Sequence, residues 1–206
     1  MFFLDKSQAI YLGDSVTEGY YATTTANRWA TLTAQNIGLA EINKGMAGTV
    51  VQNTAPVATN NFRDRYRADL TNNSAGRIFI MGGINDCLGT TYTPELYKNN
   101  LDKIVKGLIL YGFSQNRIYL LSPSYVRPNV WADFAAPLNG GSDAKYSQIR
   151  TSAREIAERY KLQFVDTYTY MQSNGGNSLL YSDGVHPSDS GHQAIADAVV
   201  SQIKIV

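Results

Sequence analysis

The chain has 206 residues, a length that predicts one domain over residues 1–206 with a sizeable core. Its 18 Lys and Arg balance 17 Asp and Glu, which argues against a nucleic-acid-binding surface because such a surface needs a basic excess. A single cysteine, Cys87, excludes an internal disulfide and a multi-thiolate metal site, and two histidines argue against a His-rich metal centre. Charged residues are only 17%, whereas Tyr alone numbers 14, a composition that suggests sugar-like partners.

The first residues do not read as a secretory signal, because Asp5 and Lys6 interrupt the apolar opening. No stretch approaches the roughly 18 apolar residues of a membrane span. We therefore expect a soluble chain, either cytoplasmic or extracellular after removal of a leader.

Short apolar runs alternate with longer stretches of helical periodicity along the chain. The first run ends at Gly13, and the most apolar one is followed by the pair Gly82 and Gly83. Runs of this length, bounded by turn residues, are typical of buried strands. They predict five strands, near residues 8–12, 40–44, 77–81, 117–121 and 162–166.

Capping residues and glycines mark the ends of the predicted helices. Thr93 followed by Pro94 is typical of a helix start, and Gly112 of its end. Gly38 follows an earlier apolar stripe in the same way, and Ser188 precedes the last one. The predicted helices cover residues 27–37, 93–111, 146–160 and 188–203.

Alternating strands and helices indicate an α/β fold with a parallel sheet and helices on both faces. Ligands of such sheets bind outside the carboxyl ends of the strands. We therefore expect functional residues in the segments that follow the strands and in the long irregular stretch 122–142.

Four segments at these positions carry chemically useful groups. Residues 13–19 contain the Ser15 hydroxyl, and residues 43–49 offer two glycine amides, Gly45 and Gly48. Residues 82–86 contain the Asn85 carboxamide, and residues 182–187 contain an acid and an imidazole three positions apart. Together they could supply a nucleophile, a base and donors to an oxyanion.

A serine hydroxyl needs a neighbouring base before it attacks a carbonyl. His186 is the candidate base, because the other histidine, His192, falls in the final helix. Asp183 can orient the imidazole and stabilise the imidazolium. The amides of Ser15 and Gly48 and the Asn85 side chain could converge on the oxyanion.

These blocks resemble the signature of the SGNH (GDSL-type) hydrolase family: GDS carries Ser15, G-x-N-D carries Asn85, and D-x-x-H carries Asp183 and His186. The resemblance implies a flavodoxin-like three-layer αβα fold with strand order 2-1-3-4-5. It also implies ester hydrolysis without a cofactor or a metal. Gly48 is preferred over Gly45 because it matches the second glycine of the family's G-x-x-G pattern.

Each block also has a structural interpretation, because Gly-Asp-Ser, Asn-Asp and Asp-Gly alone are usually turns. We interpret Asp14 and Asp86 as turn-holding residues and Cys87 as a small buried hydrophobe. We expect His192 on the final helix, at the surface or in packing.

Aromatic and basic residues near the blocks are candidate substrate contacts. Tyr20 follows the first block, and Tyr125, Arg127 and Trp131 lie in the 122–142 stretch. An aromatic surface loop that only packs on itself is an equal alternative for this stretch. The same question concerns four further aromatic residues, Tyr21, Tyr92, Phe134 and Tyr181.

The sequence thus predicts a serine esterase that removes short acyl groups, acetyl foremost, from a carbohydrate. A lipase or acyl-thioesterase acting on longer chains is the alternative within enzymes. An inactive carbohydrate-binding or structural module on the same scaffold is the alternative outside them. A flavin- or nucleotide-binding protein is disfavoured, because the first loop lacks G-x-G-x-x-G.

Overall fold

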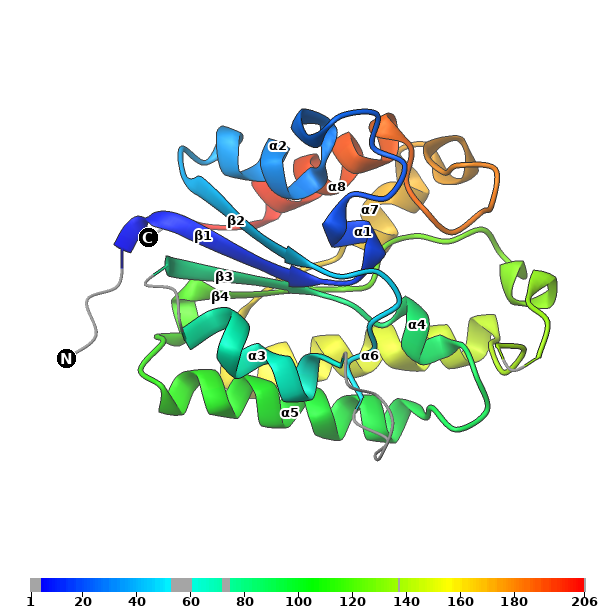
Figure 1. Cartoon of the computed structure of the whole chain (residues 1–206), viewed down its shortest axis with the longest axis horizontal. Coiled ribbons are helices and arrows are strands. Elements are labelled where there is room, and N and C mark those ends of the chain that lie inside the picture. Colours follow the sequence, from blue (N-terminus) through cyan, green and yellow to red (C-terminus); the bar gives the residue numbers. More distant parts are fainter. Residues whose placement is uncertain (1–4, 53–60, 72–74, 137, 206) are drawn as a thin grey trace.

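The computed structural model describes residues 5–52, 61–71, 75–136 and 138–205. Its centre is a parallel sheet of five strands in the order β2-β1-β3-β4-β5 (Figure 1). This confirms the expected α/β class, the parallel sheet and the strand order. The strands are β1 (Asp5–Gly13), β2 (Ala40–Gly45), β3 (Ala75–Met81), β4 (Ile118–Leu121) and β5 (Gln163–Val165).

Helices cover both faces of the sheet, as right-handed crossovers require. One face carries α2 and α8, and the other carries α3, α5 and α6 (Figure 1). The helices are α1 (Ser15–Glu18), α2 (Trp29–Asn36), α3 (Phe62–Thr71), α4 (Ile84–Cys87), α5 (Pro94–Leu110), α6 (Asp143–Tyr160), α7 (Thr167–Ser173) and α8 (Asp189–Gln202). Short 3-10 turns lie at Thr25–Asn27, Gln115–Arg117, Val130–Asp133 and Gly176–Leu179.

The predicted helix boundaries at Gly38, Thr93, Gly112 and Ser188 are confirmed, whereas α2 begins at Trp29 rather than residue 27 and α6 begins at Asp143 rather than residue 146. The Thr93 hydroxyl accepts a hydrogen bond from the Leu96 N–H at 3.1 Å and caps α5. The Ser188 hydroxyl caps α8 in the same manner. Gly38 and Gly112, which follow α2 and α5, have φ angles of +69° and +99°, the left-handed conformation that glycine adopts most readily.

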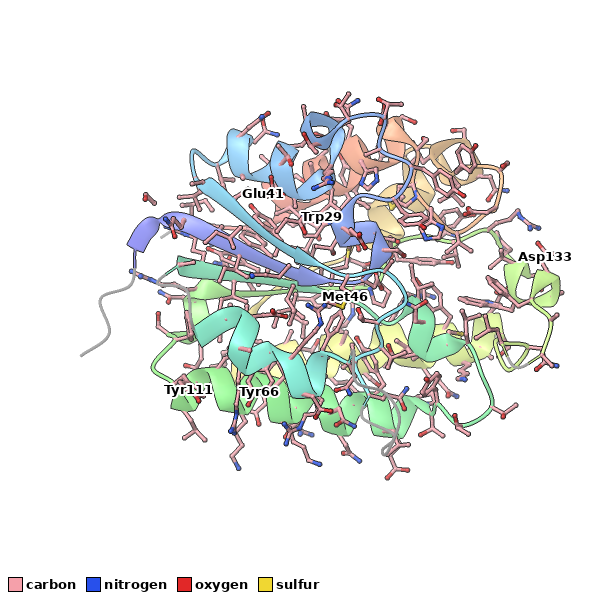
Figure 2. All side chains as sticks on the ribbon, viewed as in Figure 1. Trp29, Glu41, Met46, Tyr66, Tyr111 and Asp133 are labelled. Carbon is pink, nitrogen blue, oxygen red and sulfur yellow. The ribbon has the colours of Figure 1, made fainter. Side chains whose placement is uncertain are left out.

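A row of stacked aromatic rings crosses the sheet beneath α2. Tyr11, Phe79 and Tyr119 lie on adjacent strands, with ring centroids 4.9 and 4.4 Å apart. Trp29 of α2, labelled in Figure 2, meets the Tyr11 ring edge-on, with centroids 5.3 Å apart. All four side chains are buried, and each such ring removes about 150–250 Å² from water. Packing of this row helps to hold β1, and therefore its carboxyl end, in a fixed position.

The sequence did not predict α3 or α7. Phe62, Tyr66 and Leu70 form the buried stripe of α3, but charged residues separate them and hide the periodicity. Every described helix is too short or too polar to cross a bilayer.

Candidate active site

The Ser15 hydroxyl and the His186 imidazole meet at the carboxyl edge of the sheet. Ser15 Oγ lies 2.9 Å from His186 Nε2, although 171 positions separate the two residues. Nδ1 of the same ring lies 2.7 Å from Asp183 Oδ2. The three side chains therefore form a continuous serine–imidazole–carboxylate chain, in the order that the sequence predicted.

Ser15 is held by the tight turn between β1 and α1. The carboxylate of Asp14 accepts a hydrogen bond from the Val16 N–H at 3.1 Å and caps α1, of which Ser15 is the first residue. Gly13 cannot be replaced cheaply, because an added Cβ would lie 1.8 Å from the Thr17 hydroxyl oxygen. The turn thus places Ser15 at the start of α1, where its hydroxyl meets His186.

His186 is positioned by a turn that folds around the Asp183 carboxylate. Oδ1 of Asp183 accepts hydrogen bonds from the N–H groups of Val185 at 2.9 Å and His186 at 3.0 Å. Partial burial alone would raise the pKa of Asp183, but these two bonds and the contact with the imidazole outweigh it and lower the pKa. The carboxylate is therefore charged at neutral pH and available to the ring.

Two of the predicted oxyanion donors, the Gly48 amide and the Asn85 side chain, belong to segments that contact each other. Asn85 Nδ2 donates to the carbonyl oxygen of Thr49 at 2.9 Å, and Thr49 directly follows Gly48. The Met46 N–H donates to the Gly13 carbonyl at 3.1 Å, which ties this loop to the end of β1. Because a carboxamide carries two N–H donors, Asn85 keeps a second one for another acceptor.

Two buried carboxyl groups lie beneath this edge. Asp86 accepts hydrogen bonds of 2.9–3.0 Å from the N–H groups of Val51 and Gln52, so it holds a segment close to Gly48. Burial raises the pKa of Asp86 to about 6 and that of Asp14 to about 7. Both residues hold turns, as predicted.

Cys87 is buried, as expected of a small hydrophobe, and burial raises the pKa of its thiol to about 11. A thiol in that state is a poor nucleophile at neutral pH. Within the described ranges, no group of three or more His, Cys, Asp or Glu side chains could hold a metal ion.

Of the four candidate substrate contacts, Tyr20 lies beside the imidazole, with ring centroids 5.2 Å apart. Tyr125 is buried and donates its hydroxyl to Asn177. Trp131 is also buried, and its indole N–H donates to Asp143 at 2.8 Å.

The rest of the 122–142 stretch also has identifiable contacts. Arg127 is paired with Asp133, while its backbone N–H donates to Gly184 in the turn that carries His186. Burial gives Tyr125 and Trp131 a packing role, and substrate contact by any member of this loop stays a prediction. Tyr92 is half-buried just before α5.

Sequence reasoning missed a polar clamp between the segment after Ser15 and the start of α8. Asp189 accepts hydrogen bonds from the Thr23 N–H at 2.8 Å, the Thr23 hydroxyl at 2.6 Å and the Asn27 side chain at 2.9 Å. His192 bonds the same segment and is fully buried, so it serves packing rather than the surface. Local patterns carry no sign of this clamp, because its partners are more than 160 positions apart.

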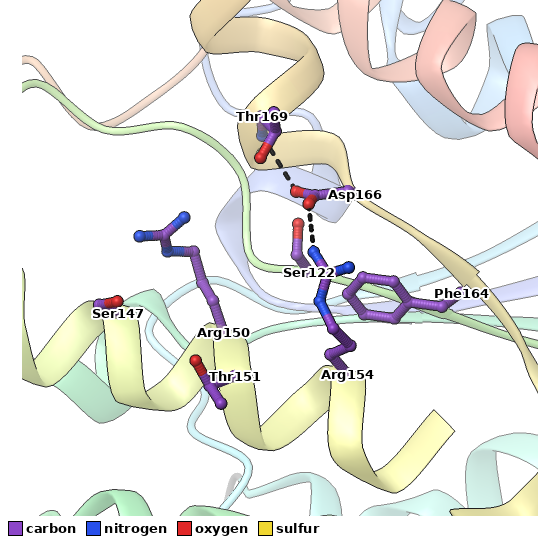
Figure 3. A pocket seen from close by; sticks show the side chains of 8 residues that line it. All are labelled: Ser122, Ser147, Arg150, Thr151, Arg154, Phe164, Asp166 and Thr169. Atoms are coloured by element: carbon purple, nitrogen blue, oxygen red, sulfur yellow. Dashed lines mark hydrogen bonds and ion pairs between the residues drawn. The ribbon is translucent and has the colours of Figure 1, made fainter. Parts of the chain in front are cut away.

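Other hollows lie outside the serine–imidazole–carboxylate chain. A cavity of about 100 Å³ lies between α6, α7 and the ends of β4 and β5 (Figure 3). Arg154 pairs there with Asp166, and the Arg150 guanidinium lies 3.5 Å over the Tyr168 ring. The arginine side chains that line this cavity are thus already paired with other protein groups. A shallower hollow of about 300 Å³ is lined by residues of 129–143, Trp131 and Phe134 among them.

A parallel α/β sheet with a serine, an imidazole and a carboxylate joined at its carboxyl edge defines a hydrolase architecture. The model of the GDSL-like Lipase/Acylhydrolase family matches residues 11–194. The chain belongs to this family, and it is a carboxylic ester hydrolase of the GDSL type. A comparison with curated proteins finds no match.

Solved structures with the same fold include several hydrolases. A lipase/acylhydrolase from Enterococcus faecalis superposes with a TM-score of 0.76 at 19% identity, over 94% of this chain and 93% of that one. A carbohydrate acetylesterase from Sinorhizobium meliloti gives 0.76 at 19% identity, over 95% and 97%. A variant of an acetyl-xylooligosaccharide esterase from Geobacillus gives 0.73 at 21% identity, over 100% and 98%. At these identities the similarity establishes the fold alone.

Proposed function

We propose that this chain is a serine esterase that removes short acyl groups, acetyl foremost, from carbohydrates. The observation that carries the proposal is the 2.9 Å contact between Ser15 Oγ and His186 Nε2, extended by the 2.7 Å contact to Asp183. Family membership supplies the class of reaction, and the acetylesterases among the structures of similar fold favour a small acyl group.

The reaction begins when Ser15 Oγ attacks the ester carbonyl carbon and its proton passes to His186 Nε2. For this transfer the other ring nitrogen must carry a hydrogen, which Nδ1 donates to Asp183. The protonated imidazole then gives its proton to the leaving alcohol, and an acyl-serine remains. Water, deprotonated by the same imidazole, hydrolyses this intermediate and releases the carboxylic acid.

Negative charge develops on the carbonyl oxygen in each step. Ser15 begins α1, so its backbone N–H has no carbonyl acceptor within the helix. Gly48 lies in an exposed turn at φ +74°, and an added Cβ there would meet open space. These two amides and the second N–H of Asn85 are the proposed donors to the oxyanion.

The test combines covalent labelling with a choice of acyl length. A fluorophosphonate should label the wild-type protein at one equivalent, and Ser15→Ala should abolish both labelling and ester hydrolysis. Acetyl esters should be turned over faster than octanoyl esters of the same alcohol. A preference for octanoyl esters would favour the lipase or thioesterase alternative. If the fluorophosphonate does not label the protein, the alternative of an inactive carbohydrate-binding or structural module is favoured.

A further inference from the structure

Three exposed tyrosine side chains lie together beside His186, and we refer to Tyr20, Tyr21 and Tyr181 as the tyrosine shelf. Their exposed fractions are 48%, 41% and 47%. The rings of Tyr21 and Tyr181 stack face to face, with centroids 3.8 Å apart and planes 10° from parallel. Tyr20 meets Tyr21 edge-on at 5.5 Å. The three side chains therefore form one contiguous aromatic cluster rather than three isolated rings.

The shelf adjoins the proposed reaction centre. The Tyr20 and Tyr21 rings lie 5.2 and 5.5 Å from the His186 ring, measured between centroids. His186 in turn lies in hydrogen-bond contact with Ser15 Oγ. A group attached to an ester bound at Ser15 therefore reaches the shelf without any movement of the chain.

The backbone conformation of Tyr21 is uncommon for a bulky residue and is fixed by neighbouring contacts. Its φ angle is +60°, the left-handed region that suits glycine or asparagine and disfavours a bulky side chain. The conformation is held on both sides, by the bond of His192 to the Tyr20 carbonyl and by the bonds of Thr23 to Asp189. Strain of this kind persists where the surrounding structure fixes it and is concentrated at functional sites.

The chemistry of the shelf favours a neutral sugar ring over an acyl chain. Tyrosine offers a flat apolar face for the C–H side of a pyranose and a hydroxyl at its edge for the sugar hydroxyls. An acyl chain prefers an enclosed apolar pocket, whereas these rings are nearly half exposed. The charged Asp183 carboxylate lies 2.7 Å from Nδ1 of His186, whose ring contacts the shelf, so an anionic sugar would be repelled there.

We propose that the tyrosine shelf binds a neutral sugar ring of the acylated substrate by stacking, and thereby selects oligosaccharide esters over simple ones. The proposal rests on the esterase function proposed above. It assigns the shelf a part in substrate binding and none in bond cleavage, so its loss should change KM rather than kcat.

The test compares an acetylated xylo-oligosaccharide with ethyl acetate, which has no ring to stack. Tyr181→Leu keeps an apolar side chain but removes the flat face, and Tyr181→Phe keeps the face. We expect Tyr181→Leu to raise KM for the oligosaccharide about tenfold, with kcat within about twofold, and to change KM for ethyl acetate much less. Tyr181→Phe should retain most of the affinity. Tyr111→Leu is the matched control, because Tyr111 is 43% exposed beyond the end of α5 and far from the site (Figure 2).

Several outcomes would overturn the proposal. Equal effects on both esters, or no effect on either, would mean that the shelf contributes no sugar selectivity. A loss that appears only with ethyl octanoate, measured as a third substrate, would assign the shelf to an acyl chain instead. If Tyr181→Leu lowers the unfolding midpoint but leaves the ratio of KM values for the two esters unchanged, the stack contributes only to stability. The esterase proposal fails separately, if Ser15→Ala retains hydrolysis.

Discussion

His192 Nε2 lies 3.1 Å from the backbone carbonyl oxygen of Tyr20, and Nδ1 of the same ring accepts the Trp29 N–H at 3.4 Å. A carbonyl only accepts, so Nε2 carries the hydrogen and the buried ring is neutral. His192 follows His186 by six positions in the chain, and Tyr20 follows Ser15 by five. The contact therefore joins the segment that follows Ser15 to the helix that follows His186. It thereby helps to hold the serine and the imidazole within hydrogen-bond distance.

Replacing His192 should destabilise the protein in a pH-dependent way. His192→Gln can keep a donor for the Tyr20 carbonyl but leaves the buried Trp29 N–H without its acceptor, a loss of about 1–3 kcal/mol. Burial lowers the pKa of His192, and the neighbouring His186 and Arg28 act in the same direction, while the Tyr20 carbonyl and Asp189 oppose it. The stability that depends on the neutral ring is complete above the unfolded pKa of about 6.5 and is lost as pH falls below it.

The measurement is urea unfolding of the wild type and His192→Gln at about pH 8 and about pH 5. The difference in free energy of unfolding should be larger at the higher pH. Gln193→Ala, an exposed neighbour on the same helix, should show neither effect. An identical difference at both pH values would mean that His192 does not titrate as the buried geometry requires.

Asp14→Asn should stabilise the protein at neutral to alkaline pH. The carboxyl group is buried, Oδ2 has no hydrogen-bond partner among the described residues, and burial raises its pKa to about 7. An acid whose folded pKa is raised contributes most stability below its unfolded pKa, and that stability is lost as pH rises through about 7. Asn keeps the oxygen that caps α1 and removes the buried charge, for a gain of about 1–2 kcal/mol above pH ~7.

Chemical denaturation between acidic and alkaline pH measures this gain, with Asp197→Asn as the same change on an exposed helix face. A destabilised Asp14→Asn protein at alkaline pH would show that the charge is stabilised by a group outside the described contacts.

Most of the fold follows from local patterns. Buried strands such as β3 and β4 are nearly continuous apolar runs, and helix ends such as Thr93 and Gly112 have characteristic residues. The strand order came from the family resemblance rather than from any local pattern. The α3 helix was not predicted, because charged residues separate Phe62, Tyr66 and Leu70 in the sequence and hide a stripe that is stabilised by packing.

The positions of the candidate site residues were predictable for a different reason. Ser15, Asn85 and His186 follow strands or precede the last helix, and the carboxyl edge of a parallel sheet gathers such positions. Fine contacts were not predictable, since the stack of Tyr21 on Tyr181 and the bond of His192 to Tyr20 depend on side-chain geometry across the whole fold.

Asp183→Asn should lower kcat by about 10³–10⁴ while the protein remains folded. Asn retains the oxygen that accepts the N–H groups of Val185 and His186, so the turn persists. The amide cannot stabilise the imidazolium, and it can turn its NH₂ toward Nδ1 and favour the wrong tautomer. Steady-state kinetics with an acetyl ester and the unfolding midpoint check both halves of this expectation. An unchanged rate would assign orientation of the ring to another group.

Asn85→Ala should lower kcat by about 10²–10³ with little change in KM, because the carboxamide is proposed to contact the oxyanion only as it forms. The substitution also removes the 2.9 Å bond to the Thr49 carbonyl, so a loosened 46–49 loop could reduce the rate by itself. Asn85→Asp loses the same bond, because a carboxylate has no N–H to donate, but it also places a negative charge beside the oxyanion. The difference in rate between the two variants therefore reports the electrostatic contact with the oxyanion. Both variants should react slowly, and Asn85→Asp should be the slower when neither lowers the unfolding midpoint. If Asn85→Asp is as active as the wild type, the oxyanion is held by backbone amides alone.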